Sequence, residues 1–254
     1  MNDKRLNTLI TDPKERTQRS QEKRAAVLKF LRDEVWSTSD IIAEVMGVKT
    51  RQAVNKLLLT LMHEEKVKRA TIDVGAGRGI TLWGLTTHGL AFSFDEDEEI
   101  KDIPVFEPSR VAVSTLPHRL DIQKARLKAL ANGWKDWTPC DRGEFIKTHG
   151  VQHRPDALAV NPEGELVAIE VERTIKTRSR YQQVIASHLK AMSDGKWGHV
   201  YYITPEGVSN RLKKVIYSID TIKVGGQQVQ LKGSYLERFT FVDLDKWIVE
   251  NDKE

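Results

Sequence analysis

The feature that most constrains the fold of this 254-residue chain is the arrangement of apolar and turn residues between positions 154 and 181. Two apolar runs, at 157–160 and 166–171, flank an Asn-Pro-Glu-Gly sequence whose residues are favoured in turns. This arrangement predicts a β-hairpin. The residues that follow predict a helix, because they place an apolar stripe at helical spacing that we assign to the core: Tyr181, Val184, Ile185, His188, Leu189 and Met192.

Acidic residues occupy corresponding places on both strands of the predicted hairpin. Residues two apart in a strand share a face, so Glu170 and Glu172 point one way and the apolar residues between and beside them point the other. If Val160 pairs with Leu166 across the turn, Asp156 lies opposite Glu170. Three carboxylates would then gather beside an apolar sheet. Such oxygen-rich groups suit Mg²⁺ or Mn²⁺.

A solvated face of an amphipathic strand is the simpler interpretation of Glu170 and Glu172. Three features favour a site instead. A Pro-Asp pair opens the preceding strand, and three like charges on one face require a counter-charge. The third feature is a basic cluster, suited to phosphate, that follows at once: Arg173, Lys176, Arg178 and Arg180.

At these residues the chain resembles the PD-(D/E)XK nuclease superfamily. It looks closest to the replication-relaxation family and its MobC-type plasmid mobilization relaxases. The resemblance covers most of residues 110–204, and more loosely the N-terminal part. The matching pieces are the HRLD run with His118 and Asp121, the RPDA run at 154–157, and Glu170-Val171-Glu172-Arg173 followed by Tyr181-Gln182.

The resemblance implies metal-dependent cleavage of a phosphodiester bond, with Mg²⁺ or Mn²⁺ as the cofactor. It places the ion on Asp156, Glu170, Glu172 and the carbonyl of Val171. The superfamily's usual lysine position is occupied here by Glu172, and Lys176 is the candidate for a displaced lysine. The catalytic set that it implies is Asp156, Glu170, Glu172, Lys176, Asp121, His118 and Gln182.

Several histidines near this region admit more than one interpretation. His118 and Asp121 lie one turn apart on a predicted helix, so they share a face. Besides a site role, His118 could cap that helix while Asp121 pairs with one of its basic residues. His149 and His153 precede the hairpin, but the glycine between them breaks any helix that would align them on a metal. We expect a substrate-side or structural role for His153.

Residues 21–94 have the pattern of a winged helix-turn-helix. Three amphipathic helical segments precede two strand-like runs joined by Gly-Ala-Gly-Arg-Gly. In this class the third helix enters the DNA major groove. Its outer face, with Arg78 at the hairpin tip, supplies the predicted DNA-binding residues: Lys49, Arg51, Gln52, Asn55, Lys56 and Arg78. The alternative is a domain that only dimerises. The resemblance adds Arg173, Arg178 and Arg180 as DNA contacts of the second domain.

Charge is unevenly distributed along the chain. Residues 1–90 carry a net charge of +5, residues 91–108 carry −6, and residues 109–254 carry +5. We expect residues 1–20 to be a flexible tail and residues 95–108 an acidic linker between two basic domains, the second spanning 109–254. Two basic halves fit a nucleic-acid partner.

The remaining composition narrows the class of protein. The single cysteine, Cys140, excludes an internal disulfide and a zinc site built on cysteines, and we expect it to be a buried small apolar residue. No apolar run has the length of a signal peptide or of a membrane span. These features predict a cytoplasmic protein without a membrane partner.

Together these observations predict an α/β (α+β) protein with an N-terminal winged helix-turn-helix and a C-terminal PD-(D/E)XK restriction-endonuclease-like domain. The predicted function is that of a relaxase-type endonuclease that nicks double-stranded DNA at a plasmid transfer origin. An accessory relaxosome protein and a coupling protein would be further partners. The alternative is a catalytically inactive, sequence-specific DNA-binding accessory protein of a relaxosome or replication complex.

Overall fold

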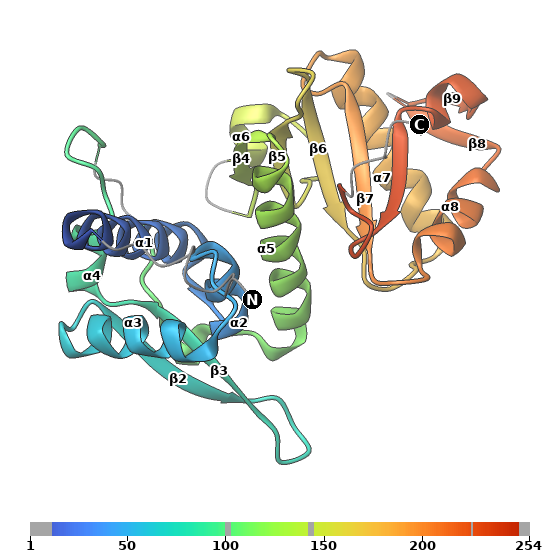
Figure 1. Ribbon diagram of the computed structural model, residues 1–254. Helices are drawn as coiled ribbons and strands as arrows, with labels where there is room; N and C mark the ends of the chain where they lie inside the picture. The colour runs from blue at the N-terminus through green and yellow to red at the C-terminus, as the bar shows by residue number, and fades with distance from the viewer. Residues whose placement is uncertain (1–11, 100–102, 142–144, 225, 249–254) are drawn as a thin grey trace, which may run out of the picture. The chain divides into compact units, whose positions relative to one another are not determined.

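The structure is a computed structural model that describes residues 12–99, 103–141, 145–224 and 226–248. Its architecture is mixed α/β, as the sequence predicts. The chain divides into two compact units, Met1–Leu116 and Pro117–Glu254 (Figure 1). Within the described ranges, no helix is both long enough and apolar enough to cross a membrane.

The first unit combines helices with a small antiparallel sheet of order β1-β3-β2. Side chains from the first three helices and the sheet share one apolar core, in which Leu31, Ile42 and Leu58 are fully buried. Its described elements are α1 (Pro13–Glu34), β1 (Trp36–Ser37), α2 (Ser39–Val45), α3 (Arg51–His63), β2 (Val67–Asp73), β3 (Gly79–Leu85), α4 (Thr87–Ala91) and the 3-10 turns Pro108–Arg110 and Val113–Thr115.

Helix α1 begins earlier than the sequence predicts. Residues 13–20, expected in a flexible tail, form its first turns, while residues 1–11 lie outside the described part of the chain. The carboxylate of Asp12 accepts a hydrogen bond from the N–H of Lys14 at 2.9 Å, and Pro13 occupies the first helical position. Further along, Arg24 pairs with Glu64 at the end of α3. This charged helix is therefore capped locally and anchored by a residue forty positions away.

The acidic segment 95–108 also differs from its prediction as a linker. Glu98 pairs with the buried Arg32 of α1 at 2.7 Å, and Asp95 pairs with Lys29 at 3.1 Å. Phe106 is fully buried beside Gly84, where any added Cβ atom would meet its side chain. The described residues of this segment thus pack onto the first unit, and the boundary between the units falls after Leu116. Residues 100–102 lie outside the described part.

The second unit is built on a mixed five-stranded sheet of order β10-β7-β6-β5-β4. Strands β4, β5 and β6 are antiparallel, whereas β6, β7 and β10 run parallel. Its described elements are α5 (Leu116–Ala131), β4 (Lys135–Pro139), α6 (Phe145–His149), β5 (Ala157–Val160), β6 (Leu166–Val171), α7 (Arg178–Ser193), β7 (His199–Thr204), α8 (Ser209–Tyr217), β8 (Thr221–Val224), β9 (Gln227–Gln230), α9 (Gly233–Leu236) and β10 (Phe239–Asp243).

Helices cover both faces of this sheet (Figure 1). On one face, Ala125 and Ala129 of α5 share a core with Val167 and Ile169 of β6. On the other face, residues of α7 and α8 pack with Ala168 and with residues of β5 and β7. The predicted division of β6 into two faces is therefore confirmed, and both faces are covered. Glu170 of β6, and Glu172 just after the strand, lie on the α7 side, where they contact His188 and Tyr181 of that helix.

The C-terminal end of the described chain is held by contacts with α5. Residues 244–248 form turns, and residues 249–254 lie outside the described part. Trp247 is buried, and its indole N–H donates to the carbonyl of Ala125 at 3.0 Å. Lys128 donates to the carbonyl of Leu244 at 2.7 Å. These hydrogen bonds fasten the turns at 244–248 to α5.

We predict that Asp243→Asn destabilises the second unit. The buried Asp243 carboxylate accepts hydrogen bonds from the N–H groups of Gly207 and Ser209 and from the Thr204 hydroxyl. Burial raises its pKa, but these bonds outweigh burial and lower the pKa to about 2. We expect a loss of about 1–3 kcal/mol in unfolding free energy at pH 7.

The pH dependence of this effect follows from the sign of the shift. A lowered folded-state pKa contributes stability above the unfolded value of about 3.9, and the contribution disappears as pH falls toward 2. The unfolding free energies of wild type and Asp243→Asn, measured by denaturation across that pH window, should therefore converge as the pH falls. The exposed Asp245→Asn is the matched control, and an equal loss in both variants would contradict the role of Asp243.

Candidate functional site

The β5–β6 hairpin places Asp156 opposite Glu170. Val160 pairs with Leu166, and Ala157 pairs with Ile169, so the predicted register is confirmed. The N–H of Asp156 donates to the carbonyl of Ile169 at 2.9 Å, which extends the pairing by one residue. In addition, the Asp156 carboxylate accepts the N–H of Val171 at 2.7 Å. Asp156 is thus held against β6 by both backbone and side chain.

His118 of α5 joins this group. Its Nε2 atom lies 3.1 Å from Oδ1 of Asp156, and both side chains are partly exposed. The hydrogen bond with Asp156 raises the pKa of His118 against the opposing effect of burial. The charge of Glu172 also raises this pKa and that of Lys176 lowers it. His118 therefore lies in the electrostatic field of three predicted site residues.

Glu172 is held by a lysine and a tyrosine. Lys176 Nζ lies 2.9 Å from its carboxylate, and the Tyr181 hydroxyl donates to it at 3.3 Å. The same hydroxyl accepts the N–H of Lys176 at 3.0 Å. Burial raises the pKa of Tyr181 to about 12, so the phenol keeps its proton. The Glu172 side chain is 9% exposed and that of Lys176 is 53% exposed, which leaves the ammonium group reachable from solvent.

Asp121 lies one turn along α5 from His118 and forms an ion pair with Arg173. The Asp121 side chain is 11% exposed, so the acidic partner of this ion pair is mostly shielded from water. Asp121 does pair with a basic residue, as one alternative predicted. That residue, Arg173, lies just after β6 and not on α5. The pair connects the first turns of α5 to the end of β6.

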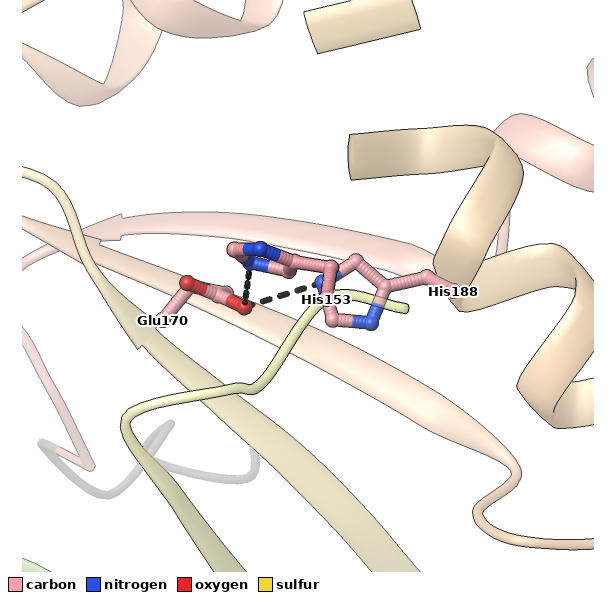
Figure 2. A group of neighbouring side chains, drawn as sticks. All are labelled: His153, Glu170 and His188. Atoms are coloured by element: carbon pink, nitrogen blue, oxygen red, sulfur yellow. Dashed lines mark hydrogen bonds and ion pairs between the residues drawn. The ribbon is translucent and has the colours of Figure 1, made fainter. Parts of the chain in front are cut away.

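Glu170 is at the centre of a cluster that the sequence did not predict (Figure 2). Nε2 of His153 lies 2.8 Å from Oε1 of Glu170, and Nε2 of His188 lies 3.0 Å from the same oxygen. Burial raises the pKa of Glu170, but the hydrogen bonds with the two histidines outweigh it and hold that pKa below its usual range. The carboxylate is therefore ionised although it is buried.

His188 was assigned to the apolar stripe of α7 and is indeed fully buried there. The stripe does place it in the core, but its ring also meets a carboxylate of β6. Sequence spacing cannot predict that contact, because the hydrogen-bond partner lies eighteen positions away. A histidine on an otherwise apolar helical stripe was the signal available. His149 lies elsewhere, stacked on Phe145.

The remaining predicted site residues of the second unit have other contacts. Gln182 donates to the carbonyl of Thr221 at 3.0 Å. Arg178 contacts the carbonyl of Ser218 and the carboxylate of Asp220. Arg180 is exposed. Cys140 is buried, as predicted, and burial raises the pKa of its thiol to about 12.

The predicted DNA-binding residues of the first unit are all solvent-exposed. They lie just before or in the first two turns of α3, or at the β2–β3 turn: Lys49, Arg51, Gln52, Asn55, Lys56 and Arg78. Arg51 has a weak contact, 3.6 Å, with the exposed Asp40. A groove of about 370 Å³ borders the exposed start of α3. Helix α1 supplies basic residues to its lining, and the sequence analysis does not predict them as DNA contacts: Arg16, Arg19, Lys23 and Arg24.

Comparison with known proteins gives little further information. No protein family matches this chain, and no curated protein matches it either. Among solved structures, the chain is similar to an apo-form mutant of ZitR from Lactococcus lactis. The two are 23% identical over 32% of this chain and 58% of that one, with a TM-score of 0.25. A match of this extent establishes neither a family nor a function.

We predict that Arg173 has a structural role through Asp121. Arg173→Met removes the cation and leaves a nearly buried carboxylate unpaired, so unfolding free energy should fall by about 1–3 kcal/mol. Arg180→Met is the control, because Arg180 is exposed and lies in the same basic cluster. Chemical denaturation of both variants measures the difference. Equal stability of the two would mean that the pair contributes nothing.

Proposed function

We propose that this chain is a DNA-processing protein that cuts one strand of double-stranded DNA with the help of a divalent metal ion. In this proposal the first unit is a winged helix-turn-helix that binds DNA, and the second is a PD-(D/E)XK-like nuclease domain. The observation that carries the proposal is the register of the β5–β6 hairpin, which sets Asp156 opposite Glu170, with Glu172 directly after the end of the same strand.

The donor chemistry of the proposed set suits a hard divalent ion, although among the described residues it is His153, Glu170 and His188 whose ligand atoms are grouped closely enough to share one. Asp156, Glu170 and Glu172 offer carboxylate oxygens, which Mg²⁺ and Mn²⁺ prefer. Each carboxylate now has nitrogen or hydroxyl partners, including His118 and Lys176. Both imidazoles approach one oxygen of Glu170, and the other oxygen points away from the rings (Figure 2). The Val171 carbonyl stays a proposed ligand.

A bound Mg²⁺ or Mn²⁺ would acidify a water molecule and offset negative charge on the scissile phosphate. The protein's own groups have complementary roles. Glu172 orients the water and accepts its proton. The exposed ammonium of Lys176, next to Glu172, balances the charge that grows on the phosphate. His118, whose Nε2 atom lies 3.1 Å from Oδ1 of Asp156, positions the Asp156 carboxylate.

The setting suggested by the resemblance is nicking at a plasmid transfer origin as a MobC-type relaxase, with a relaxosome accessory protein and a coupling protein as partners. The basic, exposed start of α3 and the basic groove beside it support DNA as the substrate. Arg178 and Arg180 lie in the first turn of α7, near the end of the basic cluster, and are proposed to contact the DNA backbone.

A second candidate is a DNA-binding accessory protein without catalysis. The observation that favours it is the environment of β6, where Glu172 occupies the position of the superfamily's usual lysine and Glu170 is buried against two histidines. In that case the second unit would retain the fold and lack turnover. The first experiment below separates these two candidates.

The proposed nuclease activity is tested with supercoiled plasmid that carries a transfer origin, incubated with Mg²⁺ or Mn²⁺. Asp156→Asn keeps the side-chain size and removes a ligand charge, so nicking should fall by about 100-fold or more. Lys176→Ala should slow nicking without loss of DNA binding. Glu206→Gln, an exposed acidic residue of the same unit, is the control and should cut normally.

Two results would count against this activity. Wild-type protein that binds the plasmid and never nicks it with either ion would support the accessory role. Nicking that survives Asp156→Asn at the wild-type rate would place the active site elsewhere.

DNA binding by the first unit is tested with a double variant at Arg51 and Lys56, both changed to Ala. Because fewer counterions are released on binding, affinity should fall and the slope of log K against log salt should flatten by about one to two units. Changing Lys14 and Lys29 to Ala removes the same net charge away from α3 and serves as the control. Equal effects of both variants would show that only net charge matters.

A further inference from the structure

Three side chains from three separate segments meet around one oxygen atom in the second unit. His153 comes from the loop before β5, Glu170 from β6 and His188 from α7 (Figure 2). The Nε2 atoms of both rings face Oε1 of Glu170, at 2.8 and 3.0 Å. The three ligand atoms lie within 4.8 Å of one another. Among the described residues, this is the group of three histidine, cysteine or acidic side chains whose ligand atoms lie close enough together to share one ion.

The two histidines are held in place by their surroundings. The N–H of His153 donates to the hydroxyl of Ser187 at 2.9 Å, which ties the loop to the residue beside His188. The His188 ring is fully buried and meets the rings of Trp197, Tyr202 and Phe239 edge to face. A rigid, largely apolar shell of this kind fixes ligand orientation before an ion arrives.

Hydrogen bonding around His188 is incomplete. If its Nε2–H donates to Glu170, its Nδ1 atom is a bare acceptor, and this buried atom has no hydrogen-bond partner among the described residues. Trp197 Nε1 and Tyr202 Oη, on rings that contact His188, are likewise buried and unpartnered in that part of the chain. Unpaired buried polar groups are unfavourable for folding. An ion bound at Nε2 would leave Nδ1 of His188 without a partner, so it is the arrangement of the three ligand atoms that supports an ion.

The donor chemistry indicates which ions would fit. Two imidazole nitrogens and one carboxylate oxygen are ligands of Zn²⁺, Mn²⁺, Fe²⁺ and Co²⁺, whereas Mg²⁺ prefers oxygen alone. Bonds of about 2.0–2.2 Å to each atom are compatible with the two nitrogen–oxygen separations of 2.8 and 3.0 Å. The His153 side chain is 21% exposed and that of Glu170 is 12% exposed, so one side stays open to a water ligand or substrate.

We infer that His153, Glu170 and His188 form a binding site for a first-row transition-metal ion, with Zn²⁺, Mn²⁺ and Co²⁺ as the ions that it accepts. This site goes beyond the proposed catalytic group of Asp156 and Glu172. It shares Glu170 with that group, but its ion binding does not depend on nicking. The competing explanation is a metal-free triad in which the two rings only stabilise a buried carboxylate.

The test measures binding of the metal alone to the full chain, after treatment with a chelator and without a histidine tag. Calorimetry with Zn²⁺, and visible absorption with Co²⁺, should give one site per chain in the wild type. His153→Ala should weaken binding by about tenfold or more. The metal should also raise the melting temperature of the wild type but not of this variant, because only the folded site binds it.

The choice of variants keeps the outcome clear. His153 is the main target, because His188→Ala removes a fully buried ring and can prevent folding. His199→Ala is the control, since His199 is a half-buried histidine bonded to Thr240 and is not part of the cluster. Asp156→Asn should retain Co²⁺ binding even where it abolishes nicking, so failure of the metal site and failure of the nuclease proposal give different results.

Two outcomes overturn the inference. Unchanged Co²⁺ affinity in His153→Ala would place the ion elsewhere. Absence of Zn²⁺ and Co²⁺ binding in the folded wild type would leave the three residues as a metal-free hydrogen-bonded triad.

Discussion

The second unit depends on a buried negative charge in the middle of its sheet. Glu170 lies on β6, the central strand, beneath α7. An unpaired carboxylate there would oppose folding strongly, because it would lose its hydration without replacement. Two imidazoles replace that hydration, and they hold the pKa of Glu170 below its usual range in spite of burial. The loop that carries His153 and the face of α7 that carries His188 are therefore both constrained by one side chain.

The other acidic groups near the end of β6 follow the same rule. Asp156 has His118 and the N–H of Val171, Glu172 has Lys176 and Tyr181, and Asp121 has Arg173. Each carboxylate is thus matched by a donor from a different segment, which connects α5, the hairpin and α7. Lys176 is the most exposed of these partners, and it is the one that could move toward a phosphate with the least disturbance.

Charge pairing also organises the first unit. Arg32 of α1 is buried and reaches both Glu98 and the carbonyl of Ser93. Arg24 on the same helix pairs with Glu64, and this pairing lowers the pKa of Glu64 to about 2 against the opposing effect of burial. Glu98 and Asp95 of the acidic segment are thus paired with basic residues of α1. The basic residues around the start of α3 are exposed to solvent. The DNA-binding role proposed for the first unit rests on these exposed basic residues.

Local pattern in the sequence determined the elements themselves. The turn residues at 161–164 and the apolar runs beside them were sufficient to predict the hairpin and its register, because pairing is set by the turn and by a period of two residues. The amphipathic helices of the first unit were predicted in the same way. These features depend on neighbours a few positions apart, so spacing alone carries them.

Tertiary structure alone decided which charged groups meet. Arg24 pairs with a residue 40 positions away, Arg32 with one 66 positions away, and His188 with one 18 positions away. The packing of the acidic segment and the His153–Glu170–His188 cluster both follow from such pairs. No periodicity encodes them, because an ion pair or hydrogen bond requires only that two groups be brought together, and the packing of helices on the sheet determines where that happens.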